Sequence, residues 1–347
     1  MADASVIAAP FDASFQTGFL MNAFRFGLVA ALLAASCALH AQTGSRITEP
    51  STSPPSRWQG DKDQLDAALR ARALTVTDPR GLWVAGQLDA GDPGARVTAY
   101  AQARVAAPTE MVYLTSLALA CLEPVQPRWP ECDATDRLAD WATRDLDNGV
   151  PMLMLADRAR QRNNATAMIA FLDEAALRPR FDDYWAKGAL LLWEEVRALP
   201  VPVEPAAKAE LAAAYGVAQS ASVANAIQTL CRDASKAAEN VRTACNAAGA
   251  AAAQRAATWS LRAAGARLAE RSANPGPQQA AAQQRLADIQ RRAFECAEAG
   301  NPIALALESA DPAARARAVG EWERRLVQDA QLGEVAACAR AAAPAKG

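Results

Sequence analysis

Histidine is almost absent from the sequence. Of 347 residues only His40 is a histidine, and a mature chain beginning after Ala41 contains none. This excludes Ser-His-Asp and Cys-His catalysis, histidine general bases and histidine-ligated zinc or haem from such a chain. Gly-x-Gly-x-x-Gly, Walker, Gly-x-Ser-x-Gly and calcium-loop motifs are also missing. We therefore expect no cofactor and no metal.

The chain has no large excess of positive or negative charge, and aromatic side chains are scarce as well. The formal net charge is −2, and the arginines are scattered singly, so no basic surface for nucleic acid is expected. Aromatic residues make up 6% of the chain, while alanine-rich stretches dominate. Because alanine favours helices over strands, the composition predicts an all-α protein.

Long apolar runs are missing too, and no transmembrane helix is predicted. The charge-free run at 26–35 spans only about ten residues, too few to cross a bilayer but enough for the core of a signal peptide. A cleavage-like sequence ends at Ala41. Residues 21–41 are thus predicted to be a signal peptide that sends the chain to the periplasm. We interpret residues 1–20 as an upstream segment from a mis-assigned start codon.

A second interpretation of this region is lipidation. Ala34-Ala-Ser-Cys37 is similar to a lipoprotein box, with alanine in place of the commoner leucine. Cys37 would then carry a lipid anchor, and the protein would be an outer-membrane lipoprotein. Both interpretations take the mature chain out of the cytoplasm.

The seven cysteines fit an oxidising compartment. Cleavage or lipidation removes Cys37 from consideration and leaves an even set that can form disulfides. Their order along the chain favours local pairing, although other pairings are possible in principle. The expected pairs are Cys121–Cys132, Cys231–Cys245 and Cys296–Cys338.

Proline and glycine positions suggest how the chain is organised. Residues 42–62 are predicted to be a flexible linker, 63–200 a helical-repeat domain and 206–347 an alanine-rich helical domain, with the proline-rich segment 200–205 as the boundary. Beyond that boundary we expect separate helices at 206–221, 222–232, 235–250, 252–272, 278–299, 302–309, 312–330 and 332–342. Asp311-Pro312 is typical of an N-cap followed by proline at the first helical position.

The first half of the chain matches itself at an offset of 71 residues. This offset is close to twice the ~34-residue length of a two-helix repeat. Small residues, an aromatic and a proline recur where helical hairpins need them. The matched pairs include Ala85 with Ala156, Tyr100 with Phe171, Pro108 with Pro179 and Tyr113 with Tyr184.

At these positions the chain resembles the tetratricopeptide-repeat family. The nearest fit is Ala156, Ala159, Met168, Phe171, Ala175 and Pro179. The resemblance covers about residues 79–198 and implies an αα-hairpin superhelix, followed here by the alanine-rich helical region. Such arrays expose concave surfaces that bind other proteins. An irregular helical bundle is the alternative.

Five aromatic residues are candidates for such a binding surface: Tyr113, Trp141, Tyr184, Trp185 and Trp193. Aromatic side chains are strong interface anchors, but at helical spacing they more often belong to a core. Asp182 and Asp183 follow Pro179 at an expected helix start. We interpret them as groups that accept backbone N–H bonds rather than as ligands.

The sequence therefore predicts a non-enzymatic interaction scaffold of the bacterial cell envelope, with an unidentified protein or peptide as partner. The rival hypothesis is a carboxylate-dependent envelope enzyme acting on glycan. Glu308-Ser309 is similar to the catalytic pair of lytic transglycosylases, but the Gly-Leu-Met-Gln stretch of that family is missing. A buried acid with a raised pKa inside a cleft would favour the enzyme.

Overall fold

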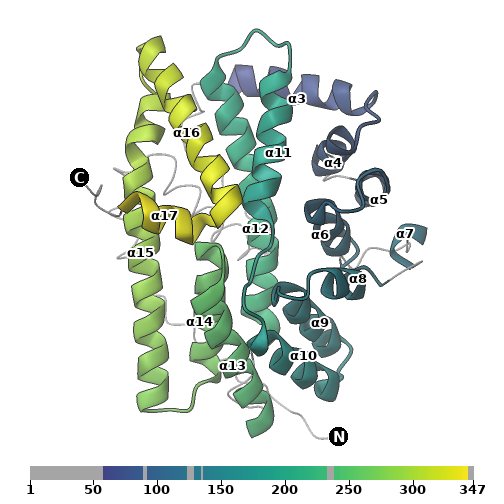
Figure 1. Cartoon of the computed structure of the whole chain (residues 1–347), viewed down its shortest axis with the longest axis vertical. Helices are drawn as coiled ribbons and strands as arrows, with labels where there is room; N and C mark the ends of the chain where they lie inside the picture. Colours follow the sequence, from purple (N-terminus) through teal and green to yellow (C-terminus); the bar gives the residue numbers. More distant parts are fainter. Residues whose placement is uncertain (1–57, 89–91, 123–128, 134–135, 233–237, 343–347) are drawn as a thin grey trace, which may run out of the picture. The chain divides into compact units, whose positions relative to one another are not determined.

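A computed structural model describes residues 58–88, 92–122, 129–133, 136–232 and 238–342. Within these ranges every regular element is an α-helix, and the only β-type pairings are two isolated bridges. The all-α prediction is therefore confirmed (Figure 1). None of the described helices is both long enough and apolar enough to cross a membrane.

The helices follow one another with short connections. Their bounds are α3 (Gln59–Ala73), α4 (Pro79–Leu88), α5 (Pro93–Ala106), α6 (Met111–Ala120), α7 (Pro130–Asp133), α8 (Arg137–Arg144), α9 (Val150–Gln161), α10 (Ala165–Leu177), α11 (Trp185–Ala198), α12 (Pro205–Leu230), α13 (Glu239–Arg255), α14 (Trp259–Ser272), α15 (Pro277–Leu307), α16 (Pro312–Leu332) and α17 (Glu334–Ala342).

Two helical pairs, α4–α5 and α9–α10, lie in the region of the internal match. Asp92 caps α5 by accepting hydrogen bonds from the backbone N–H groups of Gly94 and Ala95. Asn164 caps α10 in the same way, and Asn163 before it adopts a positive φ of 55° that makes the turn tight. α9 begins 71 residues after α4, and α10 ends 71 residues after α5.

Residues of the internal match contribute to the core of both pairs. Ala85 and Ala156 are buried, and so is Tyr100, whose ring lies against α4. A Cβ added at Gly86 would lie 2.5 Å from the Tyr100 ring, so α4 and α5 approach closely there. Phe171 is only partly buried but packs against the same core.

The proline-rich segment 200–205, which the sequence suggested as a domain boundary, is crossed by one hydrophobic core. The described residues from Trp58 onward belong to one compact unit. α12 packs on α11, α9, α3 and α16, and α13 packs on α10, so helices from both sides of the segment share one hydrophobic core. The segment is a connection between α11 and α12 rather than a linker.

The start of the helical unit also differs from the prediction. α3 begins at Gln59, so the last residues of the expected 42–62 linker belong to a helix. The reason is Trp58, which is buried in the core with the Arg315 guanidinium 5.4 Å from the centre of its ring. Residues 1–20, the signal peptide 21–41 and Cys37 lie outside the described residues.

Alanine-rich segments form longer helices than predicted. α12 runs without a break from Pro205 to Leu230, where two helices were expected. α15 continues to Leu307 through the Asn301-Pro302 step that we expected to end it. The predicted cap is confirmed, since the Asp311 carboxylate accepts hydrogen bonds at the N-terminus of α16.

The three predicted cysteine pairs are at disulfide distance, with Cα–Cα separations of 5.5, 6.4 and 5.9 Å along the chain. Cys121–Cys132 joins the end of α6 to α7, and Cys231–Cys245 joins the end of α12 to α13. Cys296–Cys338 joins α15 to α17.

Two glycines set the close crossing of α13 and α14. A Cβ on Gly249 would lie 2.5 Å from the backbone nitrogen of Ala269, and one on Gly265 would lie 2.6 Å from that of Ala253. Real Cβ atoms do not come this near to backbone, so the two helix backbones touch here because both positions lack a side chain. The short side chain of Ala252 completes the contact.

Candidate functional site

The predicted aromatic anchors lie mostly in the core. Tyr113, Trp141, Tyr184 and Trp193 are between 0% and 4% exposed. Trp193 meets Trp322 edge to face at 4.9 Å between ring centroids, which ties α11 to α16. These four side chains therefore line no open surface, because each packs into the hydrophobic core. Trp185 is partly exposed.

Four donors converge on the buried carboxylate of Asp145. The indole of Trp141 donates to Oδ2 at 3.1 Å, the hydroxyl of Tyr184 at 2.8 Å and the amide of Asn148 at 2.8 Å. Arg180 donates to Oδ1 and forms the ion pair. Burial is the largest cause that raises the pKa of Tyr184, so its hydroxyl stays protonated and continues to donate. With both oxygens occupied, Asp145 is a structural group rather than a free base or metal ligand.

Four segments distant in the chain meet beside this cluster, and we call them the seam: residues 147–149, 180–182, 256–257 and 333–335. The Gly149 N–H donates to the Arg180 carbonyl at 2.8 Å. The next two links are Ala257 N–H to Phe181 oxygen at 2.8 Å and Val335 N–H to Ala257 oxygen at 3.0 Å. The seam therefore joins the segments that precede α9 and α11 to the segment before α14 and to the start of α17.

A pair of carboxyl groups stands at the far end of the seam. Asp329 is 9% exposed, and burial together with the nearby Glu334 charge raises its pKa to about 7, against the opposing effect of Arg325. Burial also raises the pKa of Glu334, whose carboxylate accepts a hydrogen bond from the Trp259 N–H at 3.0 Å.

A raised pKa would suit a general acid, but a catalytic acid also needs a substrate cleft. Neither of the two hollows described below is lined by Asp329 or Glu334. Glu308, the other candidate acid, is exposed near the end of α15 rather than enclosed. Among the described residues no group of three His, Cys, Asp or Glu side chains could hold a metal ion.

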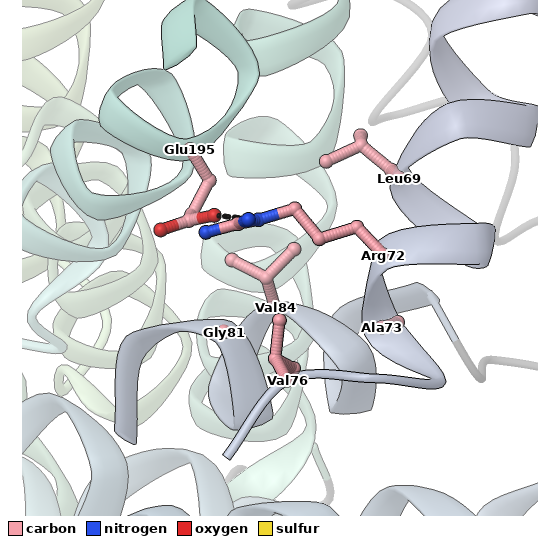
Figure 2. Close-up of a pocket in the computed structure, with 7 residues that line it drawn as sticks. All are labelled: Leu69, Arg72, Ala73, Val76, Gly81, Val84 and Glu195. Carbon is pink, nitrogen blue, oxygen red and sulfur yellow. Dashed lines mark hydrogen bonds and ion pairs between the residues drawn. The ribbon is translucent and has the colours of Figure 1, made fainter. Parts of the chain in front are cut away.

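The first hollow lies where α3 and α4 meet α11 (Figure 2). It leaves no room for a water molecule. The Glu195 carboxylate, 1% exposed, accepts hydrogen bonds from Arg72 Nε at 2.8 Å and from Arg80 Nε at 2.6 Å. The charge of the Glu195 carboxylate is thus neutralised inside the protein, and its ion pair with Arg72 holds α3 on α11. Its lining residues are Leu69, Arg72, Ala73, Val76, Gly81, Val84 and Glu195.

The second hollow is larger and open, and we call it the α10–α13 groove. It measures about 650 Å³ and is lined by Ile169 and Asp173 of α10 and by Glu239, Asn240, Thr243 and Ala244 of α13. Ile169 is partly buried and Ala244 buried, whereas the polar residues are exposed along the rim. The groove has the size of a binding site.

Sequence reasoning missed this groove because its two walls are about 70 residues apart. Asp173 and Glu239 are ordinary exposed acids in the sequence, and nothing in the helical periodicity indicates that α10 and α13 are neighbours. A pattern of paired substitutions among homologues is the kind of signal that could have found it.

Comparisons with known proteins give no relative. No family model, no curated protein and no solved structure matches the chain.

Proposed function

We propose that this chain is a non-enzymatic interaction scaffold of the bacterial cell envelope. In this proposal its α4–α5 and α9–α10 pairs belong to a tetratricopeptide-like array of helical hairpins, and it binds a protein or peptide partner in the α10–α13 groove. The signal at 21–41 delivers it to the periplasm, with lipidation at Cys37 as the alternative.

The observation that carries the proposal is the groove itself. Of the two hollows, it alone has room for side chains of another molecule. Its apolar floor and exposed polar rim match the anatomy of protein interfaces. The Cys231–Cys245 pair, whose Cys245 follows the groove residue Ala244, supports a rigid surface in an oxidising compartment. Rigid surfaces bind at a lower entropic cost than flexible ones.

The rival, a carboxylate-dependent enzyme acting on glycan, is supported by one observation only, which is the raised pKa of Asp329. Glycan hydrolysis needs two carboxyl groups flanking a bound sugar. Asp329 and Glu334 instead lie between α16, α17 and the turn before α14, where Glu334 is engaged by the Trp259 backbone. We therefore favour the scaffold.

Site-specific photo-crosslinking in living cells tests the proposal. The full chain would carry a photoreactive amino acid at Asp173 or at Thr243 in the groove, and at Gln283 as a control. Gln283 is an exposed position on α15 that does not line the groove. We expect the two groove positions to give the same discrete crosslinked envelope protein and Gln283 to give none.

Identical products from all three positions, or no macromolecular product from the groove, would contradict the scaffold proposal. A glycan crosslinked to a photoreactive amino acid placed, in a further variant, beside Asp329 would support the rival.

A further inference from the structure

We propose that the α10–α13 groove binds a partner segment that presents Lys or Arg side chains next to small apolar residues. This inference rests on the proposed scaffold function and names the chemistry of its partner.

The charge of the groove comes from two separate helices. Asp173 lies on α10, and Glu239 lies in the first turn of α13. Neither carboxylate has a hydrogen bond or an ion pair with any described residue. By contrast Glu174, the next acid along α10, pairs with Arg178 at 2.6 Å. Among the described residues, the two acids that face the groove therefore have no cationic partner.

No cation on the walls neutralises this charge. The groove is lined by two acids, two polar residues and two apolar residues, and none is basic. Arg242, one turn after Glu239 on α13, forms no ion pair with either carboxylate, and its Nε is buried. A cationic side chain of a partner would therefore meet two carboxylates, whereas an acidic one would be repelled.

The apolar floor and the uncharged rim residues indicate which other side chains the partner segment should present. Ile169 and Ala244 offer apolar contact. The side-chain oxygen of Asn240 accepts a hydrogen bond from the Val241 N–H at 2.9 Å. The side-chain NH₂ group of Asn240 can therefore donate to a partner. Thr243 adds a hydroxyl that can donate or accept. Because the rim is exposed along both helices, the groove suits a chain segment better than an enclosed small molecule.

The magnitude of the effect follows from the exposure of both acids. Exposed ion pairs contribute about 0.2–1 kcal/mol each, which corresponds to a change in affinity of up to about fivefold per pair. Such pairs are screened by salt, so the affinity should fall as ionic strength rises. The groove would then supply specificity for positive charge, while the apolar floor supplies contact area.

Fluorescence anisotropy with the oxidised mature chain tests this. The probes are three labelled peptides that share their alanine positions and carry lysine, glutamine or glutamate at the others. We expect the lysine peptide to bind best and to bind more weakly at about 300 mM than at about 50 mM salt. Asp173→Asn and Glu239→Gln should each weaken its binding about two- to fivefold, and the double variant about tenfold.

Glu298→Gln is the matched control, since Glu298 is an exposed acid of α15 outside the groove. It should leave the affinity unchanged. Equal binding of the three peptides, or loss of binding in Glu298→Gln as large as in the groove variants, would overturn the inference.

Two further outcomes separate this inference from the scaffold proposal. If crosslinks from Asp173 and Thr243 to an envelope protein persist but the lysine peptide does not bind, the charge inference fails and the scaffold stands. If sedimentation shows self-association that the double variant abolishes, the occupant is a second copy of the chain and the basic-segment inference is wrong.

Discussion

Asn148 and Asp182 pair through two hydrogen bonds in which a side-chain amide replaces a peptide group. Asn148 Nδ2 donates to the Asp182 carbonyl at 2.7 Å, and the Asp182 N–H donates to Asn148 Oδ1 at 3.0 Å. The same Oδ1 accepts the Val150 N–H at 3.1 Å. One buried side chain thus fastens the start of α9 to the turn before α11.

Replacing Asn148 by alanine should therefore loosen the seam. The change leaves the N–H groups of Val150 and Asp182 without an acceptor and removes one donor from Asp145. Unsatisfied buried groups of this kind cost about 1–3 kcal/mol each, and we expect a total loss of about 2–4 kcal/mol in the free energy of unfolding. Urea denaturation measures it, with Gln283→Ala as a neutral surface control. A loss as small as that of the control would contradict the structural role of Asn148.

Glycine substitutions test the α13–α14 crossing. Gly265→Ala forces a Cβ against backbone atoms of the facing helix, so we expect a loss of about 1–3 kcal/mol. Gly320→Ala on α16 is the matched control, because the nearest atom, Arg324 Nη1, is 4.0 Å away. It should stabilise the chain by about 0.5–1 kcal/mol, since alanine favours the helix more than glycine does. A change of the same sign in the free energy of unfolding for both variants would refute the close crossing.

The carboxyl pair predicts a pH dependence of stability. Because the pKa of Asp329 is raised to about 7 in the folded chain, the folded state binds this proton more tightly than the unfolded state does. The stabilisation is complete below the unfolded pKa, close to the ordinary 3.8, and is lost as pH rises through about 7. The loss attributable to this group is at most about 4 kcal/mol.

Asp329→Asn tests that contribution, since asparagine imitates the protonated acid. We expect the variant to be more stable than the wild type at about pH 8 and nearly equal to it only at about pH 3, below the unfolded pKa. Thermal or urea unfolding at both pH values gives the difference. Because the charge of Glu334 is one cause of the raised pKa of Asp329, the comparison measures the coupled pair rather than Asp329 alone. A difference between the two proteins that does not vary with pH would contradict the raised pKa of Asp329.

Overpacking tests the internal match. Ala156 is fully buried in α9, so Ala156→Leu should cost about 1–3 kcal/mol. Ala85→Leu in α4 should cost a similar amount if the two helical pairs are equivalent. Ala170→Leu on the exposed side of α10 should be nearly neutral. Equal effects at Ala156 and Ala170, or a neutral Ala85→Leu, would count against the repeat hypothesis.

Local chemistry was readable from the sequence, and long-range packing was not. The pairs closed by Cys121, Cys231 and Cys296 follow from order along the chain, and the cap at Asp311 follows from its proline neighbour. In contrast, 200–205 suggested a boundary because prolines resemble a linker whether or not a core continues past them. Periodicity could place Trp193 on a helix face, but only the position of Trp322 decides that this face is buried.

The groove shows the same limit. Its acids become a site only because α13 lies beside α10. The sequence indicated helices there, but it did not indicate which helices would be neighbours.

The most direct test of the central claim, an exported and disulfide-stapled chain, is the intact mass of the protein purified from the envelope without reductant. We expect a mature chain beginning at Gln42, or at a lipid-modified Cys37, with all six remaining cysteines paired and no thiol alkylated after denaturation. Recovery from the cytoplasm of an unprocessed chain that retains residues 1–41 and carries reactive thiols would contradict it.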